Sequence, residues 1–186
     1  NSEKEPLEKI ARSENLKVIR VNSFNSKFIL KLIKKKDIRF IFIGGGWPEI
    51  MKNKILRLPK IIIINTHPSL LPNYRGADVH RWQILNNEKI FGITFHFVDK
   101  FIDSGRIIFK RKIFASINNP IKLTVKLSKI ASNSIKTLFN KNLAITNYNQ
   151  KSIKIIYKRW NWFDKKFFFI KKKDFESIEN FVNASF

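Results

Sequence analysis

Apolar and polar residues follow two different periods along this chain. Apolar residues at helical spacing predict helices, which we assign to residues 6–15, 27–36, 49–56, 78–87 and 120–139. Continuous or alternating apolar runs predict strands, which we assign to residues 16–21, 38–43, 61–64, 92–98 and 106–114. Because strand and helix alternate up to about residue 100, the pattern predicts parallel βαβ units and an α/β fold.

The pattern changes after Asn140. A strand is predicted over residues 152–157, a basic and aromatic stretch follows at 158–162, and a helix is predicted over 174–184. These short segments do not continue the alternation of strand and helix. We therefore predict a main domain over residues 1–140 and a short C-terminal extension over residues 141–186.

The most specific pattern lies between Ile61 and Gly76. Four isoleucines end abruptly at Asn65, and His67 follows two positions later, before a loop that contains two prolines. A β-branched run bounded by turn residues predicts a buried strand that leads into a rigid loop. Ligands of open α/β sheets bind beyond the carboxyl ends of the strands. Asn65 and His67 are therefore expected at a binding site.

The net charge of +23, from 37 basic and 14 acidic residues, suggests a polyanionic partner such as nucleic acid. A second explanation competes with it. Lys, Ile, Asn and Phe are abundant throughout, as a compositionally biased genome would encode them, and the lysines are spread along the whole chain. Both explanations stay open at the level of sequence.

The chain has 186 residues and no cysteine. The length suits one domain with a substantial core. The absence of cysteine excludes a disulfide scaffold, a thiolate zinc site and a cysteine nucleophile, and it is consistent with a cytoplasmic location. No apolar run reaches the roughly 18 residues of a membrane-spanning helix, so no membrane association is predicted. The chain begins with Asn1 in mid-pattern, from which we expect residues upstream of it.

Three histidines are candidates for chemistry. His67 is the strongest, because it follows a predicted strand. His80 is expected to be a partly exposed helix residue, and His96, between two phenylalanines, a half-buried strand residue. No carboxylate stands at ligand spacing beside His67 and no His-Glu-x-x-His pattern occurs, so no metal site is predicted. Ser69 lacks the glycine-flanked turn of a serine nucleophile.

A polar trio remains as the candidate catalytic group: the Asn65 amide, the His67 imidazole and the Asp103 carboxylate on a second loop. A carboxylate near an imidazole raises its pKa and fixes its tautomer. An amide and an imidazolium side by side can stabilise a developing oxyanion. This combination suits acyl transfer through a tetrahedral intermediate, without a covalent bond to the enzyme.

Four motifs together resemble the 10-formyltetrahydrofolate-dependent formyltransferases. They are Asn-Thr-His-Pro-Ser-Leu-Leu-Pro at 65–72, Tyr-Arg-Gly at 74–76, Gly-Ile-Thr at 92–94 and Ile-Asp-Ser-Gly at 102–105. The resemblance covers roughly residues 38–139. It implies a Rossmann-like, mostly parallel sheet flanked by helices, with residues 1–140 as the catalytic domain. The first strand of that domain is absent from this sequence, so we expect an N-terminally truncated domain.

The resemblance also implies roles for individual residues. It places the catalytic functions on Asn65, His67 and Asp103: Asn65 and a protonated His67 would stabilise the oxyanion, while Asp103 would orient His67, keep it charged and relay the proton of the amine. The turn at Arg75 and Gly76 is expected to contact the acceptor. The residues expected to bind the formyl donor, 10-formyltetrahydrofolate, are Gly46, Trp47, Ser69, Leu70, Leu71, Pro72, Val98 and Phe101.

The acceptor is the least determined part of the resemblance. We rank a nucleotide-linked amino sugar first, methionyl-tRNA second and glycinamide ribonucleotide third. Two other functions stay open: a folate-dependent hydrolase that uses water in place of the amine, and a non-catalytic RNA-binding domain. The sequence does not indicate an oligomeric state.

Overall fold

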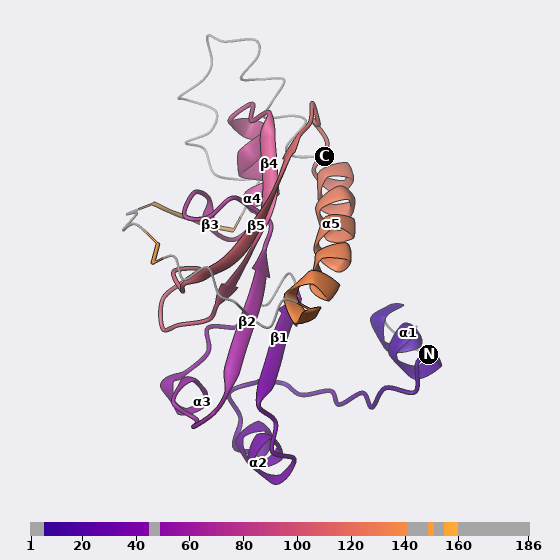
Figure 1. Cartoon of the computed structure of the whole chain (residues 1–186), viewed down its shortest axis with the longest axis vertical. Coiled ribbons are helices and arrows are strands. Elements are labelled where there is room, and N and C mark those ends of the chain that lie inside the picture. Colours follow the sequence, from indigo (N-terminus) through magenta and orange to yellow (C-terminus); the bar gives the residue numbers. More distant parts are fainter. Residues whose placement is uncertain (1–5, 45–48, 141–148, 151–154, 160–186) are drawn as a thin grey trace.

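The computed structural model describes residues 6–44, 49–140, 149–150 and 155–159 (Figure 1). The helices are α1 (Pro6–Ser13), α2 (Lys27–Lys35), α3 (Asn53–Leu56), α4 (Val79–Leu85) and α5 (Pro120–Asn140). The strands are β1 (Phe40–Gly44), β2 (Ile62–His67), β3 (Arg75–Gly76), β4 (Ile90–Phe97), β5 (Ile107–Phe114) and β6 (Ile156–Tyr157). The predicted α/β class, with a sheet between helices, is confirmed.

The main sheet has the strand order β1-β2-β4-β5. β1 and β2 pair in parallel, as the predicted βαβ unit requires. β4 differs from that expectation, because it pairs antiparallel with both β2 and β5. β4 therefore runs back along β2 from the edge where β2 ends.

Helices cover both faces of the sheet. Ile64 of β2 belongs to a core that includes Ile84 of α4 and Leu123 of α5. The preceding residue, Ile63, points to the other face, where it packs with Ile29 of α2. Successive side chains of a strand point to opposite faces, so the uninterrupted isoleucine run fits a strand buried on both sides. Figure 1 shows α5 lying along the sheet.

The predicted strand over residues 16–21 is wrong. The segment is extended, but it has no strand partner among the described residues, and Leu16 and Ile19 are 62% and 39% exposed. Alternation alone does not make a strand, because the backbone also needs a neighbour with which to exchange hydrogen bonds. Figure 1 shows this segment and α1 lying apart from the sheet.

Two further predictions are met only in part. The helix predicted over residues 49–56 is limited to α3 at its end. The strand predicted over residues 152–157 is represented by β6, which pairs in parallel with β3 in a separate two-stranded sheet. The predicted helix at 174–184 and much of the extension at 141–186 lie outside the described residues.

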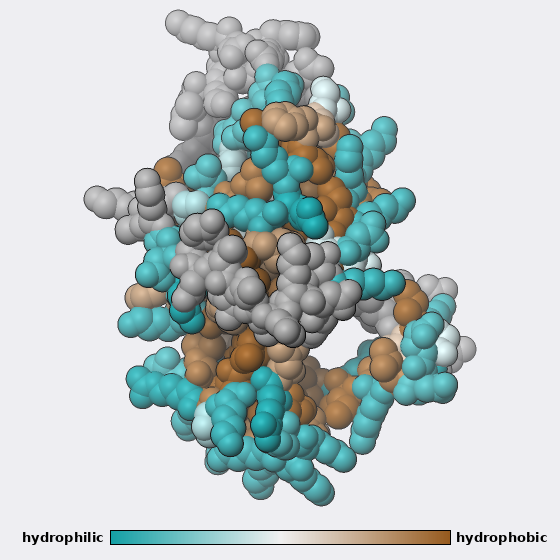
Figure 2. All heavy atoms as spheres, in the orientation of Figure 1, coloured by the Kyte–Doolittle hydropathy of each residue, from teal (hydrophilic) through white to brown (hydrophobic). Residues whose placement is uncertain are grey.

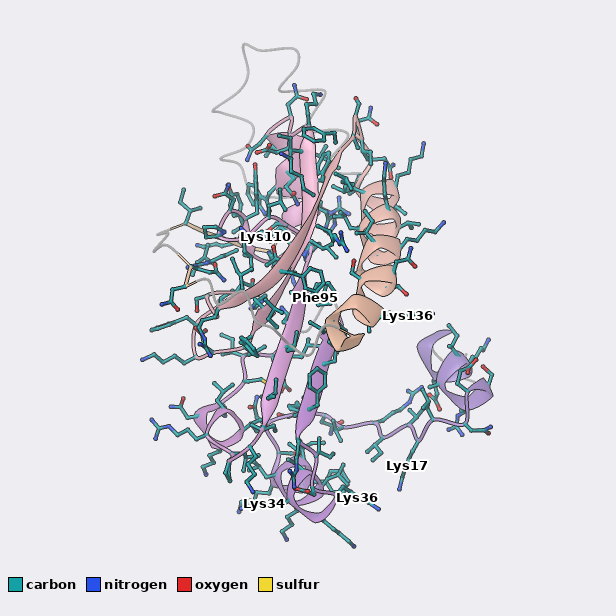
Figure 3. All side chains as sticks on the ribbon, in the orientation of Figure 1. Lys17, Lys34, Lys36, Phe95, Lys110 and Lys136 are labelled. Carbon is teal, nitrogen blue, oxygen red and sulfur yellow. The ribbon has the colours of Figure 1, made fainter. Side chains whose placement is uncertain are left out.

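Hydrophilic residues cover much of the visible surface (Figure 2). In Figure 3 Lys17, Lys34 and Lys36 lie at the periphery, while Phe95 is completely buried in the core beside the sheet. Within the part of the chain that the structure describes, no helix is long and apolar enough to cross a membrane.

Candidate functional site

The end of β2 places two polar side chains on one face of the sheet. Asn65 and His67 are separated by two positions, so both point away from the face that carries Ile64. In the antiparallel pairing with β4, Asn65 lies opposite His96, and His67 lies opposite Thr94. Residues that lie directly opposite each other share a face. The sheet therefore brings His96 next to Asn65, which the sequence did not predict.

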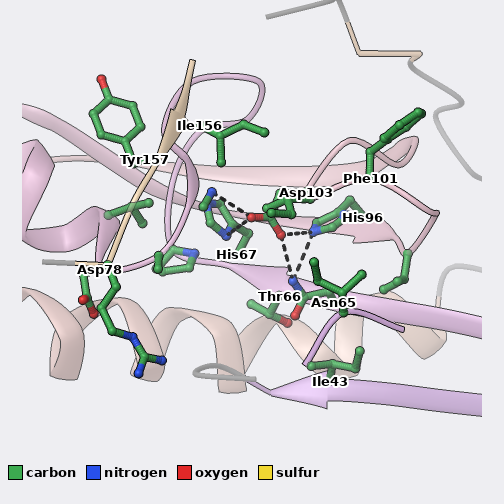
Figure 4. A pocket seen from close by; sticks show the side chains of 18 of the residues that line it. Ile43, Asn65, Thr66, His67, Asp78, His96, Phe101, Asp103, Ile156 and Tyr157 are labelled. Carbon is green, nitrogen blue, oxygen red and sulfur yellow. Dashed lines mark hydrogen bonds and ion pairs between the residues drawn. The ribbon is translucent and has the colours of Figure 1, made fainter. Parts of the chain in front are cut away.

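Asp103 reaches the same point from the loop between β4 and β5. Its Oδ2 lies 3.4 Å from His67 Nδ1, and its Oδ1 lies 3.5 Å from His96 Nε2 and 3.4 Å from Asn65 Nδ2 (Figure 4). The backbone N–H of Gly76 donates to Oδ2 at 2.9 Å. The three residues predicted as the catalytic trio are thus brought together, with His96 as a fourth member.

Backbone carbonyls determine which nitrogen of each imidazole carries the proton. His67 Nε2 lies 2.6 Å from the carbonyl oxygen of Tyr74, and His96 Nδ1 lies 2.8 Å from that of Phe97. A carbonyl oxygen only accepts, so these two nitrogens are the donors. The other nitrogen of each ring faces Asp103, and His96 Nε2 can accept from Asn65 Nδ2 at 3.2 Å. The site therefore contains three proton acceptors around one point.

The environment of His67 changes one expectation from the sequence. Burial lowers the pKa of His67 below its usual value of 6.5, although the charge of Asp103 and the Tyr74 carbonyl act in the opposite direction. His67 is therefore neutral at pH 7 in the unliganded site. This direction is opposite to the expectation that Asp103 keeps His67 charged, because the desolvation of the buried ring outweighs the attraction of the carboxylate.

The carboxylate of Asp103 stays ionised. Burial by itself would raise the pKa of Asp103, but the contact with His96, the electrostatic interaction with His67 and the Gly76 N–H outweigh it and lower the pKa to about 2. At neutral pH the carboxylate is therefore ionised, and it accepts from the Gly76 N–H and the Asn65 amide.

These groups form the floor of a cavity of about 560 Å³. The apolar residues that line the cavity include Ile43, Met51, Val98 and Phe101. The polar and aromatic lining comprises basic groups, acidic groups and a tyrosine, including His80, Tyr157, Lys158, Arg159, Glu49, Asp78 and Asp99. A cavity of this size, mainly apolar with a few convergent polar groups, is typical of a small-molecule site.

The structure brings only some of the predicted pocket residues to this cavity. Val98, Phe101 and Gly76 line it. The four residues of the 69–72 turn do not, and this differs from their predicted role as a wall of the donor site. Ser69 and Leu71 are completely buried. The Ser69 hydroxyl donates to the Asn73 carbonyl at 2.7 Å, and the Leu71 N–H donates to the Thr94 hydroxyl at 3.0 Å, so the turn packs beneath the site.

Arg75 also differs from its prediction as an acceptor contact. Its side chain is 7% exposed and does not line the cavity, because the guanidinium donates to Gln150 Oε1 from Nε and Nη2 at 3.1 and 2.7 Å. Gly46 and Trp47, predicted to bind the formyl donor, lie outside the described residues.

Sequence reasoning missed two residues at the site. His96 could have been found from its alternation between Phe95 and Phe97, but only if β4 had been paired with β2. Gln150 carried no signal, because it belongs to no motif and lies 47 residues after Asp103.

Comparisons with known proteins show the family of this chain. The sequence profile of the family described as Formyl transferase matches residues 5–130. The methionyl-tRNA formyltransferase of Caldanaerobacter subterraneus subsp. tengcongensis is 37% identical over 109 residues, which cover 58% of this chain and 35% of that protein. The corresponding enzyme of Mycoplasmopsis pulmonis is 35% identical over 134 residues, which cover 72% of this chain and 45% of that protein. The chain thus spans less than half the length of these curated relatives.

A solved structure has a similar fold. The N-formyltransferase from Helicobacter canadensis, in complex with folinic acid and dTDP-3-aminofucose, aligns with a TM-score of 0.69 and 25% identity. The alignment covers 95% of this chain and 62% of that one.

Proposed function

This chain belongs to the formyl transferase family, and we propose that it transfers a formyl group from 10-formyltetrahydrofolate to a primary amine. One observation carries the proposal: the Asn65 amide, the His67 imidazole and the Asp103 carboxylate converge on the floor of a cavity of about 560 Å³. In acyl transfer to an amine, an amide donor can stabilise the oxyanion, while a titratable ring and a carboxylate can transfer the proton.

The cavity suits a folate as the formyl donor. Its apolar lining residues, including Met51, Val98 and Phe101, offer contacts for a flat heterocycle. Asn65 also lines the cavity. Its amide can donate to a formyl oxygen without a large movement of the backbone, since β2 is paired on both edges. The donor supplies an activated formyl group, and the protein positions and polarises it.

The reaction forms a bond between the amine nitrogen and the formyl carbon, and it breaks the bond between that carbon and N10 of the donor. The amine loses one proton, and N10 gains one. Asn65 stabilises the negative charge that develops on the formyl oxygen. Asp103 and the two imidazole nitrogens that face it accept the proton from the amine and return it to N10. His67 becomes charged only when this proton arrives, because it is neutral beforehand.

For the acceptor we propose methionyl-tRNA, in place of the amino sugar that the sequence ranks first. The support comes from the curated relatives at 35–37% identity, which are methionyl-tRNA formyltransferases. The net charge of +23 and the basic residues Lys158 and Arg159, which line the cavity, suit a polyanion. A nucleotide-linked amino sugar remains the second candidate, since the Helicobacter canadensis structure was solved with dTDP-3-aminofucose.

An acceptor screen tests the proposal. The chain is incubated with 10-formyltetrahydrofolate and methionyl-tRNA, a dTDP-linked amino sugar, glycinamide ribonucleotide or no acceptor, and the formylated product is measured by mass spectrometry. We expect formyl-methionyl-tRNA, and we expect no product from the Asp103→Asn variant. If only the dTDP-linked amino sugar is formylated, that sugar and not methionyl-tRNA is the acceptor. Formate release without an acceptor would indicate a hydrolase, and no turnover in any arm would overturn the proposed function.

A further inference from the structure

Asp103 lies on a loop that does not by itself determine where the carboxylate points. Asp103 has a backbone φ of +48°, in the left-handed region that a non-glycine residue adopts only when its surroundings require it. Bonds within the loop involve Asp99, whose carboxylate accepts from Ser104 Oγ at 2.5 Å and from the Phe101 N–H at 3.0 Å. These bonds close the loop from Asp99 to Ser104 around Asp103, but neither of them is made by the backbone of Asp103 itself.

Gln150 supplies that contact. Its Nε2 lies 3.0 Å from the carbonyl oxygen of Asp103 and 2.6 Å from that of Gly105. A side-chain amide has two N–H groups on one nitrogen, so each carbonyl can receive one of them. The two carbonyls stand on either side of Ser104. Gln150 therefore holds the backbone on both sides of Ser104, whose side chain is bonded to Asp99.

Gln150 is itself oriented by Arg75. Its Oε1 accepts from two nitrogens of the buried Arg75 guanidinium, which assigns the oxygen and nitrogen of the amide. The residue after Arg75 is Gly76, whose N–H donates to the Asp103 carboxylate at 2.9 Å. The contacts therefore close a ring from Arg75 through Gln150 and Asp103 to Gly76. This ring holds the Asp103 backbone and its carboxylate at the same time.

We propose that Gln150 is a positioning residue for Asp103. It holds the loop in the conformation in which the carboxylate faces His67 and His96. Gln150 does not line the cavity, so it acts through Asp103 and not through a contact with substrate. The catalytic consequence rests on the proposed formyl transfer, whereas the structural consequence does not.

Two substitutions separate the contacts of Gln150. Gln150→Met keeps the length of the side chain and removes all of its hydrogen bonds. Gln150→Glu keeps an acceptor for Arg75 but removes both donors to the loop. We expect both variants to lose kcat by on the order of 10–100-fold, because a displacement of about 1 Å in a reacting group has effects of that size. KM for the formyl donor should stay within about twofold, since Gln150 does not contact it.

Asn119→Ala is the matched control. Its Oδ1 accepts from the Lys122 N–H at 2.9 Å at the start of α5, and Asn119 does not line the cavity. We expect the control to lower the melting temperature by about 2–4 °C, as loss of a helix cap does in a chain of this size, with kcat unchanged. A kcat in Gln150→Met within twofold of the unmutated chain would overturn the proposal. A raised KM with a normal kcat would do the same, because it would make Gln150 a substrate contact.

NMR of the unmutated chain keeps the proposal testable if a variant does not fold or if no acceptor is turned over. We expect couplings across the hydrogen bonds from Gln150 Nε2 to the carbonyl carbons of Asp103 and Gly105. In folded Gln150 variants the ring ¹⁵N shifts of His67 and His96 should change, and in Asn119→Ala they should not. Absence of the couplings overturns the positioning role, whereas absence of turnover with the couplings present overturns only the proposed function.

Discussion

The two halves of the candidate site are built in different ways. Asn65 and His67 lie on β2, whose two edges are paired with β1 and β4, so the regular backbone of the sheet determines where these side chains point. Asp103 lies on a loop with a left-handed backbone, and its position depends on Gly76 and Gln150. The strand half therefore takes its geometry from neighbouring strands, and the loop half takes it from single contacts with distant segments.

This difference leads to different sensitivities. Many hydrogen bonds of the sheet hold the strand half in place. Substitutions near it should therefore lower the free energy of unfolding without displacing the side chains of Asn65 and His67. The loop half has few contacts, and each of them bears directly on the Asp103 carboxylate. Substitutions in the loop half should therefore alter turnover more than stability. Four predictions test this contrast.

The largest effect is expected for Asp103→Asn. The substitution keeps the shape of the side chain and removes the carboxylate from the group of acceptors that takes up the proton of the amine. We expect kcat to fall by on the order of 100–1,000-fold or more, as in other sites that lose a principal polar group. Donor binding, measured by calorimetry, should stay within a few-fold. Asp37→Asn is the control, because Asp37 is exposed and bonded to Arg39 away from the cavity. Equal turnover in the two variants would remove Asp103 from the mechanism.

Gly76→Ala should lower both the stability of the chain and its turnover. Gly76 has a φ of +115°, and a Cβ there would meet the carbonyl oxygen of Tyr157 at 2.1 Å. The backbone must move, and its N–H then leaves the Asp103 carboxylate. We expect a loss of about 3 kcal/mol in the free energy of unfolding, together with a lower kcat.

Gly44→Ala provides the comparison in the strand half. A Cβ at Gly44 would have its nearest contact at 3.9 Å, with the Phe42 ring. Chemical denaturation should show a change within about 0.5 kcal/mol. Similar losses in the two glycine variants would contradict the expectation that a Cβ at Gly76 collides with the backbone of Tyr157.

The pH dependence of stability should separate His67 from Asp103. The folded-state pKa of His67 is lowered, so the unfolded chain takes up this proton first, and stability falls as the pH drops below 6.5. The folded-state pKa of Asp103 is about 2 against an ordinary 3.8, so its stabilising contribution is present above 3.8 and is lost as the pH falls to about 2. A shift of this size corresponds to about 2 kcal/mol.

Urea unfolding between pH 8 and pH 2 measures both steps. His67→Gln should remove the step below pH 6.5, and Asp103→Asn should remove the step between pH 3.8 and 2. Comparison with the unmutated chain cancels the other carboxylates. If His67→Gln leaves the first step intact, the pKa of His67 is not lowered in the folded chain.

The smallest effect is expected for Ser26→Ala. Ser26 Oγ accepts from the Ile29 N–H at 3.3 Å at the start of α2, a helix that packs against the strand half. We expect a loss of about 1 kcal/mol with kcat unchanged. Ser13→Ala, at the exposed end of α1, is the control and should change stability by less than about 0.5 kcal/mol. A kcat loss in Ser26→Ala as large as that in Gly76→Ala would contradict the claim that turnover is more sensitive to the loop half of the site than to the strand half.

The sequence was most informative where local pattern and packing coincide. The isoleucine run predicted β2, and the break at Asn65 predicted the edge where the site lies. The same reasoning was wrong for residues 16–21, because alternating residues need a partner strand that a pattern cannot supply. It also left His96 out of the site. The pattern shows that His96 alternates with its neighbours along a strand, but it does not show which strand pairs with that one and so which residues lie opposite His96.

The sequence by itself determined the strand end, the residue types of the trio and the family to which they belong. Tertiary structure decided which faces meet. It placed His96 opposite Asn65, and it left the Ser69–Pro72 turn beneath the site instead of on the cavity. It also brought Gln150 to the carbonyl of Asp103. The physical reason is the sequence separation of the interacting residues. Hydrophobic pattern and turn chemistry depend on a few neighbouring residues, whereas these hydrogen bonds and this burial depend on residues that only the folded chain brings together.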